Sequence, residues 1–261
     1  MTRCTILNYH IIDEPRSSLE APFCCFPSKF DEHMRLLKEG GFDVIMLAQL
    51  LECMAGTMPW PERAVVITFD DGMRCVYENA LPILARYGFS ASVFVVSGLL
   101  DKDNDWLILE GWPRRPMLSR SQVAELDRVG FDIGSHTTTH RRLGTASAHE
   151  ILGEVQDSKA RLEDILSKEV VHFAYPYGSF NRLARDAVEV TGYRAACSTI
   201  AGRNLPDTDR FALRRATILG NESVRSFKHK VMFGTSLFAG TKAVVRDVLT
   251  TVRLMRHKCH A

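Results

Sequence analysis

Short apolar runs alternate with segments of helical spacing along most of this chain, and this alternation constrains the fold more than any other feature. Ala64–Phe69 (AVVITF) is the clearest run, because it is apolar throughout and has the length of a strand. Strands that alternate with helices are typical of a buried parallel sheet. The predicted strands are Cys4–Ile12, Phe42–Met46, Ala64–Phe69, Ser90–Val96, Phe131–Gly134, Val170–Ala174 and Tyr193–Ser198. This α/β pattern has no obvious linker and predicts one barrel-like domain of about seven strands.

Capping residues and helical spacing place helices between these strands. Ser28 and Ser119 are predicted N-caps, and Gly40-Gly41 and Gly130 follow predicted helix ends. The predicted helices are Lys29–Glu39, Met73–Tyr87, Gln122–Val129, Ser147–Leu166 and Asn181–Val190.

The last part of the chain is strongly basic. From Arg225 to Ala261 it holds eight Lys or Arg and one acid, whereas the whole chain has a formal net charge of +2. Phe233–Lys258 has mostly helical spacing. We therefore expect residues 1–222 to form the barrel and residues 223–261 to form a basic helical extension packed on or beside it. The charges are either a solvated face or a contact for an anionic membrane surface. No nucleic-acid motif appears, so no nucleic-acid partner is expected.

The sequence shows no sign of export or membrane insertion. No apolar run approaches the roughly 18–20 residues that span a bilayer. The N-terminus, MTRCTILNYHII, lacks a basic region followed by an apolar core and a small-residue cleavage site, so a cleaved signal is not expected. Seven cysteines without a CxxC pair favour reduced thiols over a disulfide framework. We expect a cytoplasmic protein, or one that is peripheral on the inner face of the membrane.

Four polar clusters stand where predicted strands end. They are His10, Asp70-Asp71, His136 with His140, and the turn Tyr175–Gly178. Barrel enzymes carry their chemistry at the C-terminal ends of the strands. Four such clusters on one face would be unusual for a purely structural protein.

His136 and His140 have the spacing of a shared metal site. On a helical turn, an i, i+4 pair places both imidazoles on one side. Alone, such a pair is more often solvated or capping, and Asp70-Asp71-Gly72 alone is better explained as a helix cap and turn. Together, two imidazoles and one carboxylate leave positions open for water and substrate, as a hydrolytic metal site requires. The second carboxylate could then face the attacking water.

Three motifs in order resemble a known family. ITFDDG (Ile67–Gly72), SHTTTH (Ser135–His140) and FAYPYG (Phe173–Gly178) are similar to the leading motifs of the polysaccharide deacetylase family, also called carbohydrate esterase family 4. The resemblance covers roughly Ile6–Leu219. It implies a distorted (β/α) barrel and a divalent metal, usually Zn²⁺, with Co²⁺, Ni²⁺, Mn²⁺ or Fe²⁺ as alternatives.

The resemblance also assigns roles to residues of this chain. It implies that Asp71, His136 and His140 bind the metal and that Asp70 is the general base. Thr137 would brace the loop between the two histidines. The turn of Tyr175, Pro176, Tyr177 and Gly178 would line the substrate groove, with the Tyr177 backbone N–H at the oxyanion.

Two family features are missing. The third motif usually begins with Arg, where this chain has Ala174, and no Leu-x-His supplies the usual general acid. Poly-N-acetylglucosamine deacetylases resemble this chain in having Tyr-His at the end of the first strand, so His10 is the expected acid. Arg215, in ALRRATI, is the expected replacement for the missing Arg.

The expected activity is metal-dependent N-deacetylation of a sugar, which yields a free amine and acetate. The substrate would be an N-acetylated sugar or a lipid- or nucleotide-linked glycan. The long irregular stretch Ser97–Met117, with Trp106 and Trp112, is typical of a substrate rim. One alternative is an amidohydrolase of the same fold that acts on a non-sugar amide or a cyclic ureide. A second is a non-enzymatic glycan-binding protein with a degenerate site.

Overall fold

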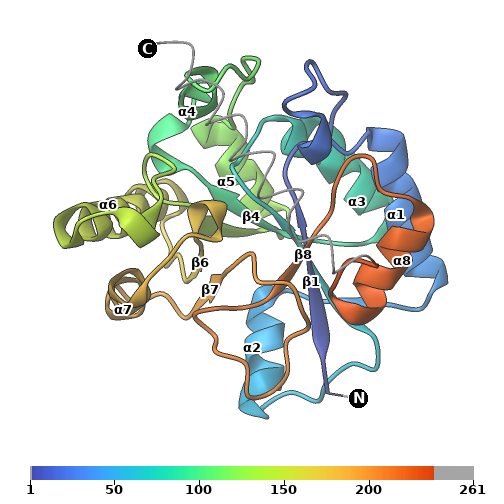
Figure 1. The fold of residues 1–261 in the computed structure, drawn as a ribbon. Coiled ribbons are helices and arrows are strands. Elements are labelled where there is room, and N and C mark those ends of the chain that lie inside the picture. Colours follow the sequence, from blue (N-terminus) through green and yellow to red (C-terminus); the bar gives the residue numbers. More distant parts are fainter. Residues whose placement is uncertain (1, 238–261) are drawn as a thin grey trace.

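A nearly closed parallel barrel forms the centre of the protein (Figure 1). The computed structural model describes residues 2–237. Its strands are β1 (Cys4–Tyr9), β2 (Asp43–Val44), β3 (Ala64–Phe69), β4 (Ser92–Val95), β5 (Asp132–Ser135), β6 (His172–Ala174), β7 (Ala195–Cys197) and β8 (Arg215–Thr217). Seven of them follow the order β7-β6-β5-β4-β3-β1-β8, and β2 pairs with β3. The predicted α/β barrel of about seven strands is confirmed.

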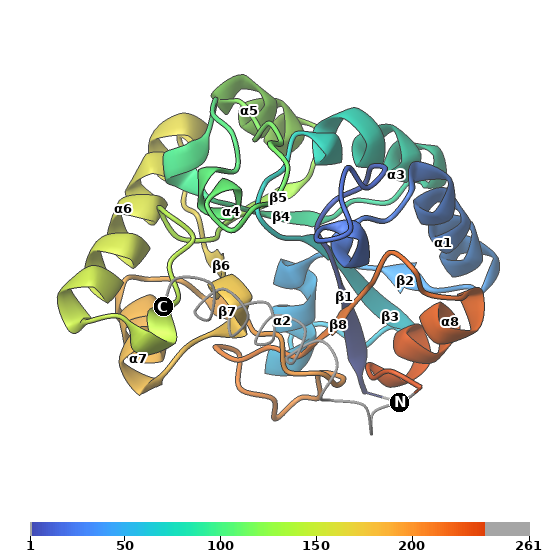
Figure 2. The same cartoon turned by 45° about the horizontal axis from the view of Figure 1, so that its top comes forward.

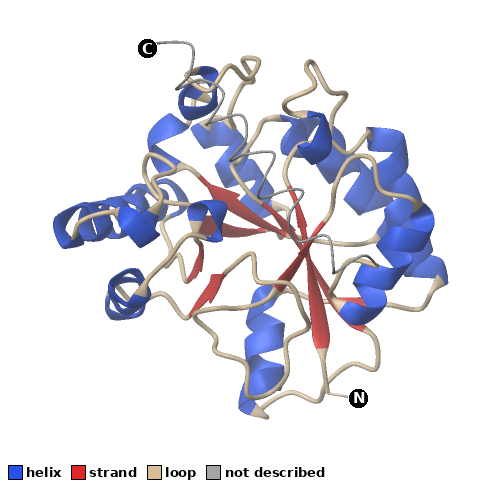
Figure 3. Cartoon of the chain, in the orientation of Figure 1, coloured by secondary structure: helices blue, strands red, loops and turns tan. Residues whose placement is uncertain are grey.

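Most of the helices lie around the outside of the strands (Figures 2 and 3). They are α1 (Pro27–Glu39), α2 (Leu47–Ala55), α3 (Leu81–Tyr87), α4 (Asp105–Ile108), α5 (Arg120–Arg128), α6 (Ala148–Leu166), α7 (Arg182–Val190) and α8 (Val224–Phe233). None of the helices within residues 2–237 is both long and apolar enough to cross a membrane. The six cysteines in this range are buried and unpaired.

Side-chain alternation assigns the side chains of the strands to two different clusters of the core. On β1, Leu7 and Tyr9 belong to the large cluster between sheet and helices, whereas Ile6 belongs to a smaller cluster with Phe94. Leu47 and other apolar side chains of α2 join this smaller cluster. Both faces of the strands are therefore covered, as the uninterrupted apolar runs predicted.

Two local predictions about helices were wrong, and proline explains both. Ser28 lies inside α1 and does not cap it, because Pro27 occupies the first helical position and Phe26 precedes it. The helix predicted over Met73–Tyr87 is divided into a π-helical turn, Val76–Ala80, and α3. Pro82, at the start of α3, lacks an amide hydrogen and cannot continue the usual bonding pattern.

Helix α8 joins the predicted C-terminal extension to the barrel. The Thr5 hydroxyl of β1 donates to the Val231 carbonyl at 2.9 Å, and Phe227 stacks on His33 of α1 at 3.8 Å between ring centroids. This helix ends at Phe233, with Gly234 in the left-handed conformation. Almost all of the predicted helix Phe233–Lys258 lies outside the described residues.

Candidate active site

Two strand ends bring a carboxylate and two imidazoles together. Asp71 follows β3, and His136 follows β5 directly. The His140 Nε2 lies 3.1 Å and the His136 Nε2 3.6 Å from Asp71 Oδ1. One ligand atom from each residue lies within 4.8 Å of the others, and all three side chains are buried. The structure thus assembles the three residues that were expected to bind the metal.

The loop between the histidines is not the helical turn that their spacing suggested. Thr137 and His140 have φ values of 68° and 63°, in the left-handed region that β-branched residues rarely adopt. The His140 amide donates to the Thr137 hydroxyl at 3.0 Å. Glu154 of α6 accepts from the amides of Thr138 and Thr139 at 2.8 and 2.9 Å. Thr137 therefore contacts the loop as expected, but in a strained turn.

The protonation states of this cluster suit a divalent cation. The His136 Nδ1 lies 2.7 Å from the Ala174 carbonyl, which directs its Nε2 toward Asp71. Burial lowers the pKa of His136 to about 4, so the imidazole is neutral at pH 7. Burial by itself would raise the pKa of Asp71, but its hydrogen bond and charge interaction with His140 lower it. Two imidazole nitrogens and one carboxylate are a donor set that Zn²⁺ binds.

Asp70 is held from the opposite side by Arg215 of β8. The guanidinium donates from Nη1 to Oδ1 and from Nη2 to Oδ2, both at 2.7 Å. Asn8 of β1 adds a bond to Oδ2 at 3.2 Å. Burial would raise the pKa of Asp70, but Arg215 and His136 hold it well below its usual range. The structure thus makes the predicted contact between Arg215 and Asp70, and it adds Asn8, which no sequence pattern singled out.

Removing Arg215 should move the acidic limb of the pH–rate profile to higher pH. In Arg215→Met, Asp70 loses the charge that keeps its pKa low, so it takes up a proton at a higher pH and its carboxylate form is lost earlier on acidification. Breaking one side of a buried pair also costs roughly 3–5 kcal/mol of stability. Thermal melts and pH–rate profiles of the wild type and variant test both effects. An unmoved acidic limb in a folded variant would mean that Arg215 does not tune Asp70.

His10 directly follows β1. It lies close enough to both aspartates to be one of the several groups that, against the effect of burial, lower their pKa. The ring packs edge-on against Phe23, with centroids 5.4 Å apart. Its Nδ1 is buried and has no hydrogen-bond partner within residues 2–237. The structure therefore places the expected acid beside the cluster.

The turn after β6 contributes Tyr177 but not Tyr175. The Tyr177 ring packs edge-on against His140, with centroids 4.6 Å apart, and the Arg142 guanidinium lies over the Tyr177 ring, 3.5 Å from its centroid. Tyr175 was expected to line the groove, but its side chain is fully buried and donates to the Phe211 carbonyl at 3.1 Å. The Tyr175 side chain therefore points into the core, because side chains alternate in direction as β6 leads into the turn.

The other two residues of this turn act through the backbone. Pro176 is buried, and Gly178 has a φ of 61°. A Cβ on Gly178 would lie 2.0 Å from the Thr199 hydroxyl oxygen, so only glycine fits there. The turn thus holds the backbone around Tyr177 in one shape.

Aromatic side chains from the long loop also contact the site. Trp106 stacks on His140, with centroids 4.6 Å apart, and Trp112 packs on Phe23 at 5.5 Å. The sequence singled out both tryptophans as rim residues, but it did not predict these partners. Phe23 was missed, since nothing in its local pattern distinguishes it from a core residue.

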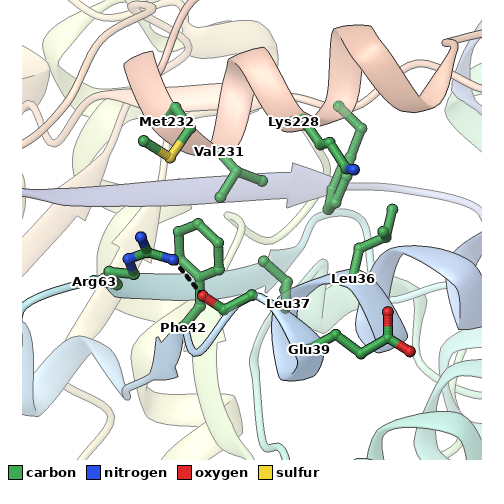
Figure 4. A pocket seen from close by; sticks show the side chains of 10 residues that line it. Leu36, Leu37, Glu39, Phe42, Arg63, Lys228, Val231 and Met232 are labelled. Atoms are coloured by element: carbon green, nitrogen blue, oxygen red, sulfur yellow. Dashed lines mark hydrogen bonds between the residues drawn. The ribbon is translucent and has the colours of Figure 1, made fainter.

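A separate hollow lies between α1 and α8 (Figure 4). Its volume is about 330 Å³, and its lining includes Leu36, Phe42, Val231 and Met232. Arg63 donates to the Gly40 carbonyl at its edge. None of the candidate catalytic residues lines it, so the chemistry belongs to the cluster at the strand ends.

Two imidazoles and a carboxylate, with a second carboxylate beside them at the ends of barrel strands, are typical of a metal-assisted hydrolase. The comparison with known families agrees. A family model described as polysaccharide deacetylase matches residues 58–196, more than half of the chain. The chain belongs to this family, and the predicted family and enzyme class, a hydrolase of carbon–nitrogen bonds other than peptide bonds, are confirmed.

Two curated relatives cover most of the chain. Bacillus subtilis YxkH is 27% identical over 222 residues, which make up 85% of this chain and 74% of YxkH. The poly-β-1,6-N-acetyl-D-glucosamine N-deacetylase of Escherichia coli K12 is 25% identical over 238 residues. That match covers 78% of this chain but only 35% of the Escherichia coli enzyme.

Solved structures agree on the fold. The Streptococcus pyogenes deacetylase PplD, in complex with acetate, is similar with a TM-score of 0.73 and 27% identity, over 85% of this chain and 94% of PplD. Ammonifex degensii IcaB has a TM-score of 0.76 at 21% identity, over 90% of this chain and 97% of that chain. The second likeness concerns the fold alone.

Proposed function

We propose that this protein removes the acetyl group from an N-acetylated glycan, with a divalent metal, Zn²⁺ foremost, held by Asp71, His136 and His140. The observation that carries the proposal is the buried three-ligand cluster with the ionised Asp70 beside it, in a chain that belongs to the polysaccharide deacetylase family. A bound divalent ion supplies Lewis acidity toward an amide oxygen and makes water more acidic.

The residues around the cluster divide the proton transfers between them. Asp70, ionised and oriented by Arg215, accepts a proton from the attacking water. The Tyr177 backbone N–H donates to the amide oxygen as negative charge develops on it. His10 donates a proton to the leaving nitrogen, because an amine leaves a tetrahedral carbon only when its nitrogen is protonated. The products are acetate and a free sugar amine.

The substrate we propose is a glycan that contains N-acetylglucosamine or a related sugar. The names of the Escherichia coli and Staphylococcus aureus relatives, poly-β-1,6-N-acetyl-D-glucosamine N-deacetylases, support this class. More specifically, we propose that the substrate is a lipid- or nucleotide-linked glycan intermediate inside the cell. The membrane contact proposed for the basic segment depends largely on residues after 237, which the structure does not describe.

Acetate release from defined oligosaccharides tests the activity. The protein is loaded with Zn²⁺ and incubated with N-acetylglucosamine oligomers, simple acetamides and a cyclic ureide, and mass spectrometry follows the loss of acetyl groups. We expect turnover of the oligomers. Turnover of the amides or the ureide alone would favour the amidohydrolase alternative. Binding of the oligomers without turnover, whichever divalent metal is loaded, would favour the alternative of a non-enzymatic glycan-binding protein.

Replacing His10 should lower kcat without loss of metal. We expect His10→Gln to reduce kcat by at least about 10²-fold, as is usual for a lost general acid. It should also remove the alkaline limb of the pH–rate profile, where the wild-type acid loses its proton. The matched control is His149→Gln, because His149 is exposed at the start of α6 and undergoes the same change of side chain. An unchanged alkaline limb would show that the proton comes from another group.

A further inference from the structure

A buried arginine joins the two loops that border the candidate active site. Arg115 lies in the β4–α5 loop (residues 96–119) and is 2% exposed. Its Nε and Nη2 bind the two carboxylate oxygens of Glu20 at 2.7 and 2.9 Å, and its Nη1 binds Asp13 at 2.7 Å. Its Nη2 also donates to the Glu14 carbonyl at 2.7 Å. All three partners belong to the β1–α1 loop (residues 10–26), which begins with His10.

The same two loops form a row of aromatic contacts that ends on His10. Trp112 comes three residues before Arg115 and packs on Phe23, which comes three residues after Glu20. Phe23 in turn packs edge-on against the His10 ring. The ion pairs and the ring contact therefore join the same two loops, and the ion pairs hold together the segments that carry these rings.

One of the two nitrogens of the His10 ring lacks a hydrogen bond within residues 2–237. Its Nδ1 has no hydrogen-bond partner in the described part of the chain, so no bond at that atom fixes the ring plane. A side chain that must deliver a proton needs a fixed orientation, which is supplied by the residues packed around it. Here the ring contact recorded for His10 is Phe23, whose loop is held by Arg115.

We propose that Arg115 is a positioning residue for the candidate active site: its buried pairing with Glu20 and Asp13 holds Phe23 and Trp112 in place and thereby orients His10. An arginine suits this task because its planar fork matches the carboxylate of Glu20 at two points. The inference rests on the proposed function only in that His10 serves as the acid. The arrangement of the two loops can be tested without any turnover.

The test compares Arg115→Met with Arg114→Met. Arg114 is the neighbouring residue in the same loop, its side chain is 65% exposed, and it pairs with Asp103 at the surface, so its replacement removes the same charge without touching the buried network. In a Trp60→Phe background, we expect Arg115→Met to increase acrylamide quenching of the remaining tryptophans. Arg114→Met should leave the quenching unchanged. Equal quenching in both variants would overturn the proposal.

A comparison of kcat values tests whether Arg115 acts through His10. We expect Arg115→Met to lower kcat about 10-fold with full metal content, an amount that corresponds to about 1.4 kcal/mol. In a His10→Gln background the same change should cost almost nothing, because two residues that act as one unit are not additive. Equal losses in both backgrounds would reduce Arg115 to a structural role and overturn the proposal.

Two further results would change which measurement decides the proposal. If Arg115→Met does not fold, Glu20→Gln, which keeps the shape of the partner and removes its charge, takes its place in both arms with the same expected results. If the wild type releases no acetate from any substrate, the proposed function fails, and the quenching comparison alone decides whether Arg115 holds the loops.

Discussion

Loss of either histidine ligand should abolish bound metal and acetate release together. We expect His136→Ala and His140→Ala, purified without chelators, to contain far less than one equivalent of divalent metal and to show no measurable turnover. Two protein ligands cannot hold Zn²⁺ tightly, and both imidazoles lie within reach of the same oxygen of Asp71. Elemental analysis and an acetate assay on the same samples measure the two quantities.

His149→Ala is the matched control for these variants, because His149 is exposed and lies at the start of α6, apart from the cluster. It should keep both metal and activity. Dialysis of the wild type against a chelator should abolish turnover, and added Zn²⁺ should restore it. Full metal content in both ligand variants would contradict the assignment of the site, and full activity without metal would contradict the proposed chemistry.

The sequence was sufficient to predict which residues the structure brings together as the candidate site, because these residues follow strand ends. Asp70 and Asp71 come directly after the apolar run Ala64–Phe69, and His136 comes soon after the short predicted strand Phe131–Gly134. Parallel strands of a barrel bring such residues to one face. The contact between Arg215 and Asp70 was predicted only through resemblance. β8 has three residues, Arg215–Thr217, and follows an irregular segment, so no hydrophobic pattern marks it as a strand.

The geometry of the turns could not be predicted from spacing. The i, i+4 separation of His136 and His140 suggested a helical turn, yet the chain brings the rings together through a bend with positive φ at Thr137. That conformation is unfavourable for threonine and depends on tertiary support, here from Glu154 of α6. α2 was also missed, since its role in closing the inner core is a property of the assembled barrel.

Asp70→Asn should keep the metal and lose most of the turnover. The change preserves size and removes the proton acceptor, which is typically worth roughly 10²–10⁴-fold in rate. It also has a structural cost, because Arg215 donates to both oxygens of Asp70, and the new amide nitrogen would face one of these donors. The buried guanidinium would then lack its counter-charge, so a lower melting temperature is expected as well.

A double variant separates the chemical effect from the structural one. Asp70→Asn combined with Arg215→Met replaces the buried ion pair by two neutral side chains and so removes the uncompensated buried charge that makes the single variant costly. We expect the double variant to regain much of the melting temperature lost in Asp70→Asn while its kcat stays low, because no carboxylate is restored. Recovery of kcat along with stability would show that the unpaired Arg215, and not the missing base, had slowed the reaction. Asp70 would then be a partner for Arg215 alone, and the proton acceptor would have to be sought elsewhere in the site.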